Sequence, residues 1–137
     1  FETIVAAGEN CFNQHHQPSD RRIKAEDFLL IDFGATTGEY LADITRTFAV
    51  GAITSEMQAI HDAARGATEL GAECLRPGAS INDVWQTIKD YFDTTDFAMH
   101  STISGHCFGL DVHERPFILE GDPFQLQPGM TTTMEPG

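Results

Sequence analysis

Two aspartates in neighbouring apolar stretches constrain the fold of this chain most. Asp32 and Asp43 each lie in a run with the composition of a β-strand, and residues 36–39 between the runs have that of a turn. If the hairpin turns at Thr37 and Gly38, Asp32 faces Asp43 directly, with Cβ atoms roughly 5 Å apart. Two carboxylates so placed on apolar strands need a shared proton or a cation between them. We therefore predict that the hairpin provides half of a metal site.

Two alternatives to a metal site exist for these carboxylates. Arg46 is a neighbouring cation that could neutralise one of them, but on a strand it has the opposite parity to Asp43 and points to the other face. An isolated Asp32 could also cap a turn or accept backbone hydrogen bonds. The mirrored position of Asp43 favours the metal site over both.

Length and charge restrict the class of protein. The 137 residues amount to one domain or less, and 41% hydrophobic and 21% charged residues are typical of a globular protein with a core. The net charge of -13 argues against a nucleic-acid or anionic-membrane partner, and the apolar runs are too short to span a bilayer. Three cysteines at scattered spacings favour free thiols in a reducing cytoplasm over a disulfide framework: Cys11, Cys74 and Cys107.

Periodicity predicts strands first, then two helices, then extended segments. The strands are expected at residues 2–7, 28–34 and 39–50, the loop at 8–27, the helices at 54–75 and 80–93, and the extended segments at 97–103, 106–113 and 129–135. Thr54 or Ser55 is a candidate N-cap for the first helix, and residues 80–83 form a capping pattern for the second. This order predicts an α+β domain with helices on one face of a largely antiparallel sheet. Because both ends fall within or directly after predicted strands, we expect a fragment of a larger domain.

A glycine-broken segment carries two histidines. His106 and His113 are separated by an odd number of residues, so a straight strand would point them to opposite faces. Both can serve one site only if the chain bulges or leaves the sheet between them, which Gly109 favours. By the same parity Cys107 points away from His106. A single histidine in such a segment more often has a structural role. Two histidines in the same segment favour a functional site instead.

The last predicted strand ends in a carboxylate. Glu135 shares a face with Thr131 and Thr133, although a glutamate at a strand end can also simply be exposed. Together, three carboxylates and one imidazole suit Mn(II), Co(II), Fe(II) or Zn(II) and can hold two ions: Asp32, Asp43, His106 and Glu135. Two bridged metal ions lower the pKa of a bound water and polarise a carbonyl, which is hydrolytic chemistry.

Three spaced motifs resemble the pita-bread metallopeptidases, and within them the Xaa-Pro aminopeptidase and prolidase branch. The motifs are Asp32-Phe33-Gly34-Ala35 with Asp43-Ile44-Thr45-Arg46-Thr47-Phe48, then Gly105-His106 with Gly109-Leu110-Asp111-Val112-His113-Glu114, then Met134-Glu135-Pro136-Gly137. The resemblance covers essentially the whole chain. It implies a pita-bread fold, a curved antiparallel sheet with helices on its outer face, incomplete at both ends. Residues 1–137 would be part of a C-terminal catalytic domain whose first helices and final strands are missing.

The resemblance also implies the ligand roles. Asp32 would chelate one ion, Asp43 would bridge both ions, and His106 and Glu135 would hold the other ion. Glu135 would also shuttle a proton between the attacking hydroxide and the leaving amine. A fifth ligand, a second bridging glutamate, would lie beyond Gly137, so residues 1–137 alone are expected to be inactive.

Two histidines are implied to face the substrate. His113 matches the residue that hydrogen-bonds the substrate carbonyl and its tetrahedral intermediate, and His15 matches one that lines the substrate pocket. Many family members carry another histidine at the position of Thr102. His100 lies two residues upstream of that position, and whether His100 takes over the role of this histidine stays open. Gln14 replaces a usual proline.

The implied activity is dinuclear metal-dependent hydrolysis of the bond between an N-terminal residue and proline. Manganese is the expected metal, with cobalt, zinc or iron as alternatives, and the expected substrates are small peptides with proline second. A homodimeric parent protein in the cytoplasm is expected. The alternatives are a methionine aminopeptidase, a creatinase-like hydrolase, or a non-catalytic binding module. The residue types at positions 43–46 and 111–114 resemble the proline branch more than the methionine aminopeptidases. A binding module would typically have lost ligand residues, whereas all four candidate ligands are present in this chain.

Overall fold

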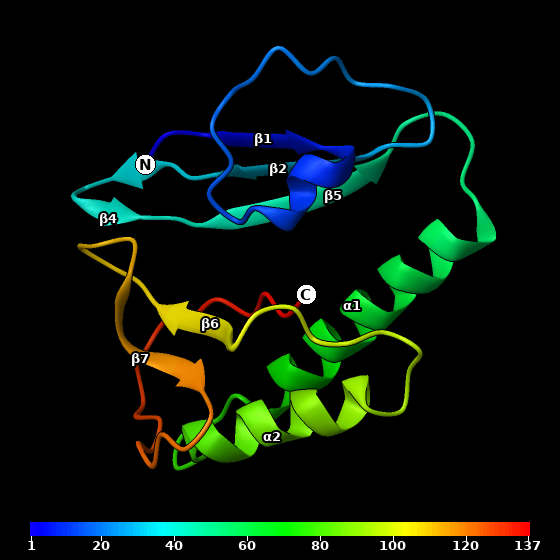
Figure 1. Ribbon diagram of the computed structural model, residues 1–137. Helices are drawn as coiled ribbons and strands as arrows, with labels where there is room; N and C mark the ends of the chain where they lie inside the picture. Colours follow the sequence, from blue (N-terminus) through cyan, green and yellow to red (C-terminus); the bar gives the residue numbers. More distant parts are fainter. The chain divides into compact units, whose positions relative to one another are not determined.

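The computed structural model describes all 137 residues, and they form two compact units, residues 1–59 and 60–137. Each unit has its own antiparallel pairing (Figure 1). The first unit consists of strands and one short helix, and the second contains most of the helical residues. The α+β class predicted from the sequence is confirmed.

The first unit is built on a three-stranded antiparallel sheet in the order β1-β2-β5. Its elements are β1 (Ile4–Ala7), the 3-10 helix η1 (Gly8–Phe12), β2 (Phe28–Phe33), β3 (Thr36–Thr37), β4 (Tyr40–Leu41) and β5 (Ile44–Ala49). The strand predicted at residues 39–50 is therefore interrupted at residues 42–43. The short hairpin β3–β4 forms a separate two-stranded sheet.

The two faces of this sheet differ in polarity. One face carries Asp32 between its register partners Ile4 and Thr45. The other face is apolar at most positions, and four of its side chains are exposed: Val5, Phe33, Ile44 and Phe48.

A buried ion pair holds the long loop between η1 and β2. The Arg21 guanidinium donates two hydrogen bonds of 2.8 Å to the Asp27 carboxylate, and the Lys24 amide adds a third of 2.8 Å. Nε of Arg21 also lies 2.8 Å from Oε1 of Glu9 in η1. Arg21 therefore ties η1 to the residue that precedes β2, across a segment with little regular structure.

The second unit packs two helices and a hairpin. Most of α1 (Ser55–Cys74) belongs to it, with α2 (Ile81–Phe92), β6 (Ile103–Cys107) and β7 (Glu114–Leu119). Thr54 caps α1, since its Oγ1 accepts a 3.1 Å hydrogen bond from the Met57 amide. None of the helices combines the length and the apolar character that a bilayer crossing requires.

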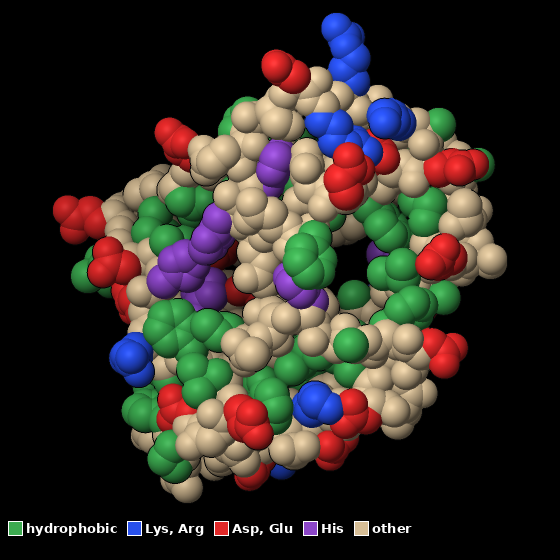
Figure 2. Space-filling model, viewed as in Figure 1, with side chains coloured by type: hydrophobic (Ala, Val, Ile, Leu, Met, Phe, Trp, Pro, Cys, Tyr) green, Lys and Arg blue, Asp and Glu red, His purple; other side chains and the backbone are tan.

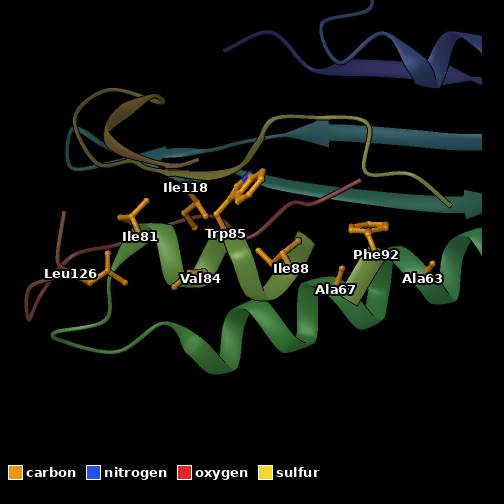
Figure 3. Packing of buried hydrophobic residues seen from close by; sticks show 9 residues of the cluster. All are labelled: Ala63, Ala67, Ile81, Val84, Trp85, Ile88, Phe92, Ile118 and Leu126. Carbon is orange, nitrogen blue, oxygen red and sulfur yellow. The ribbon is translucent and has the colours of Figure 1, made fainter. Parts of the chain in front are cut away.

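The core of this unit centres on one face of α2. Side chains at helical spacing contact small residues of α1 and apolar residues further along the chain (Figure 3): Ile81, Val84, Trp85, Ile88 and Phe92 of α2, Ala63 and Ala67 of α1, Ile118 of β7, and Leu126. The indole of Trp85 donates a 3.0 Å hydrogen bond to the Thr102 carbonyl, so its polar atom is satisfied.

Both predicted helices are confirmed within a residue at each end, but the predicted cap of α2 is wrong. Ser80 lies at the N-cap position and makes no side-chain capping bond. Instead the first amides of α2 bond to the chain that returns after β7: Ile81 to the Phe124 carbonyl at 2.9 Å and Asn82 to the Asp122 carbonyl at 3.0 Å. These carbonyls satisfy donors that a capping side chain would otherwise serve.

The extended segments after residue 96 are only partly as predicted. Of residues 97–103 only Ile103 is in a strand, and β7 was not predicted at all. Residues 129–135 contain one isolated bridge, Thr132 to Cys107, although several of their backbone groups bond to β6. All three cysteines are free. Acidic side chains are scattered over the face seen in Figure 2, in keeping with 21 Asp and Glu against 8 Lys and Arg.

The Arg21–Asp27 pair predicts a specific pH dependence. The hydrogen bonds from Arg21 and then from the Lys24 amide lower the pKa of Asp27 from 3.8 to about 2. A lowered carboxyl pKa contributes stability above the unfolded value, and this is lost as the pH falls through the folded value. We expect Asp27→Asn to unfold at lower urea concentration than wild type at pH 7, and the difference to shrink between pH 4 and pH 2. The exposed Asp20→Asn in the same loop is the control, and a difference for Asp27→Asn that does not change with pH would contradict this prediction.

Candidate functional site

The hairpin that carries the two aspartates turns one residue later than predicted. Thr37 pairs with Tyr40, so Gly38 and Glu39 form the turn, with φ values of 53° and 72° as a type I′ turn requires. Asp32 consequently pairs with Thr45, and the predicted direct pairing with Asp43 is wrong. When the turn moves by one residue, the cross-strand partner of each residue moves by two. Asp43 therefore keeps the face that the sequence predicted for it. In this register Asp43 is the diagonal neighbour of Asp32, roughly 7 Å away in a regular sheet.

One carboxylate oxygen of Asp32 lacks a hydrogen-bond donor. Its Oδ1 is buried and has no hydrogen-bond partner. A buried carboxylate oxygen is strongly disfavoured without a donor or a cation. The neighbouring backbone is also tightly packed, because a Cβ at Gly34 would lie 2.1 Å from the Ala42 carbonyl oxygen. Gly34 therefore allows the residue before Asp43 to lie against the end of β2.

Close backbone contact also places His106 and Glu135 in the second unit. A Cβ at Gly105 would lie 2.4 Å from the Thr133 carbonyl oxygen. The Thr133 amide donates to the His106 carbonyl at 2.8 Å, and the Glu135 amide donates to the Ser104 carbonyl at 3.0 Å. The β6–β7 register shifts on both sides of His106, whose side chain is buried.

The hydrogen bonds of His106 define what its ring can do. Its Nδ1 lies 3.0 Å from the Cys107 carbonyl, which can only accept, so Nδ1 carries a proton. In the neutral ring Nε2 then has the lone pair, and it lies 3.0 Å from Oε1 of Glu135. Two acceptors this close need a positive charge between them, either a proton or a metal ion. Ligand atoms at neighbouring positions of an octahedral ion, each about 2.1 Å from it, are about 3 Å apart, so the spacing of this pair is compatible with a metal site.

The environment of Glu135 favours its charged form. Burial raises the pKa of this carboxyl, but hydrogen bonds from His106 and Thr133 and the charges of His106 and His113 outweigh it, so the pKa is lowered overall. Oγ1 of Thr133 donates to Oε1 at 2.8 Å. A carboxylate held in its charged form in this way suits the binding of a cation.

His113 joins this group by the route predicted from the glycines. β6 ends at Cys107, and the chain then bends so that the rings of His106 and His113 meet edge to face with centroids 4.5 Å apart. Glu114 closes the intervening loop, since its Oε1 accepts from the Leu110 and Asp111 amides at 2.8 and 3.0 Å. The prediction that the chain leaves the sheet between the two histidines is confirmed.

The structure also gives the local surroundings of three other histidines. His15 is exposed in the loop after η1, where its amide donates to Oδ1 of Asn13 at 3.2 Å, and its substrate-pocket role stays a prediction. The amide of His100 donates to the Gly137 carbonyl at 2.7 Å. His61 is a surface residue of α1, with its side chain 44% exposed.

The predicted ligands divide evenly between the two units. Asp32 and Asp43 belong to residues 1–59, and His106 and Glu135 to residues 60–137. The structure contains no group of three or more His, Cys, Asp or Glu side chains arranged to hold a metal ion. Each unit contributes one feature that suits a cation: the unsatisfied oxygen of Asp32 and the His106–Glu135 pair.

Sequence reasoning missed two residues that support this site. Thr133 was placed on the same face as Glu135 without a role, and Glu114 was noted only as part of a motif. A hydroxyl two residues before a strand-end carboxylate, on its own face, is a signal that could have identified Thr133. Glu114 gave no comparable signal, because its contacts depend on how the loop folds.

Comparisons with known proteins agree with the sequence motifs. The model of metallopeptidase family M24 matches residues 1–137. An Xaa-Pro dipeptidase of Pyrococcus furiosus is 36% identical over 141 residues, which cover 100% of this chain and 40% of that protein. The chain thus spans about two fifths of the length of the curated relatives it matches.

Solved structures show the same likeness. A prolidase from Thermococcus sibiricus superposes with a TM-score of 0.92 at 34% identity, covering 99% of this chain and 37% of that one. An X-Pro aminopeptidase from Thermotoga maritima gives a TM-score of 0.93 at 30% identity, covering 99% and 39%. These likenesses confirm the predicted pita-bread fold.

Glu114 provides a test of how the His113 loop is held. Replacing it with alanine removes the acceptor of two exposed amides, which water can then solvate, so we expect Glu114→Ala to lower the free energy of unfolding by about 0.5–1.5 kcal/mol. Amide hydrogen exchange should lose protection at Leu110 and Asp111 while the core of α2 is unaffected. Glu120→Ala, an exposed glutamate after β7, is the control. Unchanged exchange at both amides would show that Glu114 does not hold the loop.

Proposed function

Because this chain belongs to metallopeptidase family M24, we propose that its protein hydrolyses the peptide bond between an N-terminal residue and proline. The names of the similar proteins, an Xaa-Pro dipeptidase, a prolidase and an X-Pro aminopeptidase, support this reaction class. The observation that carries the proposal is the His106–Glu135 contact of 3.0 Å with the His113 ring beside it. A carboxylate can act as a general base, and an imidazole can donate a hydrogen bond to a developing oxyanion, which are two functions that assist hydrolysis of an amide.

We propose Asp32, Asp43, His106 and Glu135 as ligands of two divalent ions, with manganese preferred and cobalt, zinc or iron as alternatives. The set is rich in oxygen with one nitrogen, which suits these ions better than a thiolate-binding metal. The unsatisfied Oδ1 of Asp32 and the paired acceptors of His106 and Glu135 support the assignment. When bound, such ions supply a hydroxide at neutral pH and polarise the substrate carbonyl.

The residues of the chain then have distinct tasks. Glu135, ionised through its contacts with His106 and Thr133, would accept the proton of the attacking hydroxide and pass it to the leaving amine. His113, exposed beside His106, donates a hydrogen bond to the oxygen that gains charge as the carbonyl is attacked. The Cys107 carbonyl fixes the ring of His106 through Nδ1, which aims Nε2 at Glu135.

Other assignments are kept as predictions of the sequence. His15 is proposed to line the substrate pocket, and the substrates to be small peptides with proline at the second position. A homodimeric parent in the cytoplasm is likewise proposed, without nucleic-acid or membrane partners. A methionine aminopeptidase, a creatinase-like hydrolase and a binding module are the alternatives that the next experiment distinguishes.

Substrate choice tests the proposed reaction. The full-length protein, loaded with Mn(II) or Co(II), should cleave Gly-Pro and not peptides that begin with Met-Ala. Mass spectrometry of the products measures both reactions, and protein treated with a chelator is the control. Cleavage of the Met-Ala peptides alone would identify a methionine aminopeptidase, and cleavage of neither would favour the creatinase-like enzyme or the binding module.

Removing the proposed bridging ligand tests the metal assignment. We expect Asp43→Ala in the full-length protein to abolish turnover and bound metal without unfolding the protein, because the side chain is only half-buried. Metal content by mass spectrometry and unfolding by circular dichroism give the two readouts. Glu39→Asn is the matched control, since it removes a carboxylate from the same hairpin and asparagine tolerates the positive φ there. Retained metal and activity in Asp43→Ala would rule out the bridging role.

A further inference from the structure

We propose that Thr133 is a positioning residue that fixes the Glu135 carboxylate beside His106 and thereby sets the metal affinity of the protein. This inference rests on the proposed function, in which Glu135 and His106 are ligands. It adds a residue that would touch neither metal nor substrate. Thr133 lies on the same extended segment as Glu135, two residues before it.

The hydroxyl of Thr133 contacts both proposed ligands. Its Oγ1 accepts a 3.0 Å hydrogen bond from the His106 amide and lies 2.8 Å from Oε1 of Glu135. The same Oε1 lies 3.0 Å from Nε2 of His106. These three contacts close a ring that contains the His106 backbone, the Thr133 hydroxyl, the Glu135 carboxylate and the His106 imidazole.

The direction of each hydrogen bond follows from the chemistry. An amide can only donate, so Oγ1 is the acceptor from His106, and its single proton remains for another partner. The His106 carbonyl, 3.3 Å from Oγ1, already accepts from the Thr133 amide at 2.8 Å, and the contact of Oγ1 with Glu135 is the shorter one at 2.8 Å. The hydroxyl proton is therefore given to Glu135. A hydrogen bond to a carboxylate is stronger than one between neutral groups.

Glu135 needs such a restraint because its side chain is flexible and 37% exposed. A free glutamate side chain populates several rotamers, and it loses that freedom when it is fixed. A hydroxyl anchored to the backbone of the other ligand selects the rotamer that faces Nε2. Partners that orient metal ligands in this way typically contribute 10- to 100-fold to metal affinity.

The test compares three variants of the full-length protein. Thr133→Val keeps the shape and removes the hydroxyl, and Thr133→Ser keeps the hydroxyl. Thr131→Val is the matched control, because Thr131 lies on the same segment and its hydroxyl bonds to the Phe108 carbonyl instead. Mn(II) alone is titrated into each metal-free protein, with free Mn(II) measured by electron paramagnetic resonance. Gly-Pro cleavage is then measured at saturating Mn(II).

We expect Thr133→Val to bind Mn(II) roughly 10- to 100-fold more weakly than wild type, with Thr133→Ser and Thr131→Val close to wild type. At saturating Mn(II), kcat of Thr133→Val should fall while KM is retained, because Thr133 does not contact substrate. Wild-type affinity in Thr133→Val, or equal losses in the Val and Ser variants, would overturn the inference.

The proposed function fails in a different way. If wild type binds Mn(II) but cleaves no Xaa-Pro peptide, the reaction is wrong, and the ranking of the affinities still decides the role of Thr133. If wild type binds no Mn(II), both proposals fall.

Discussion

The segment at residues 131–135 lies against β6 because residue 105 has no side chain. Any Cβ there would meet the Thr133 carbonyl oxygen at 2.4 Å, which is far inside van der Waals contact. With glycine at this position, the backbones of Ser104 and His106 bond directly to Glu135 and Thr133. An imidazole and a carboxylate that are distant in sequence are thereby held 3.0 Å apart by main-chain geometry. Substituting Gly105 would disturb this contact before it affected the chemistry of either side chain.

The parts of the fold that sequence patterns predicted best are those set by local periodicity. Both helices have an apolar stripe and a stop signal, and their limits were found within a residue. The hairpin register depends instead on which two residues adopt positive φ. Glu39 does so, which a residue with a side chain rarely does, and the preference for glycine at the second turn position misplaced the pairing by two residues. β7 was missed because Pro116 interrupts its strand-like composition.

For the candidate site, too, residue spacing predicted some contacts and not others. Parity and glycine placement predicted that the chain must leave the sheet between His106 and His113 if both are to serve one site, and the structure shows the chain leaving the sheet and the two rings in contact. The hydroxyl of Thr133 and the carboxylate of Glu114 act through backbone amides whose positions exist only once the bulge and the loop have formed. Such supporting contacts depend on tertiary structure, so composition and spacing do not reveal them. The candidate ligands Asp32, Asp43, His106 and Glu135 were chosen from residue type and spacing alone, and their metal-binding role stays a prediction.

The apolar face of the three-stranded sheet has a consequence for handling this polypeptide. Val5, Phe33, Ile44 and Phe48 present exposed hydrocarbon on one surface, which favours self-association in water. The net charge of -13 opposes that association through repulsion between molecules. Added electrolyte shortens the range of this repulsion to about 3 Å at 1 M. Colloidal stability of residues 1–137 therefore decreases as ionic strength rises, and dilute buffer is the condition that keeps them dispersed.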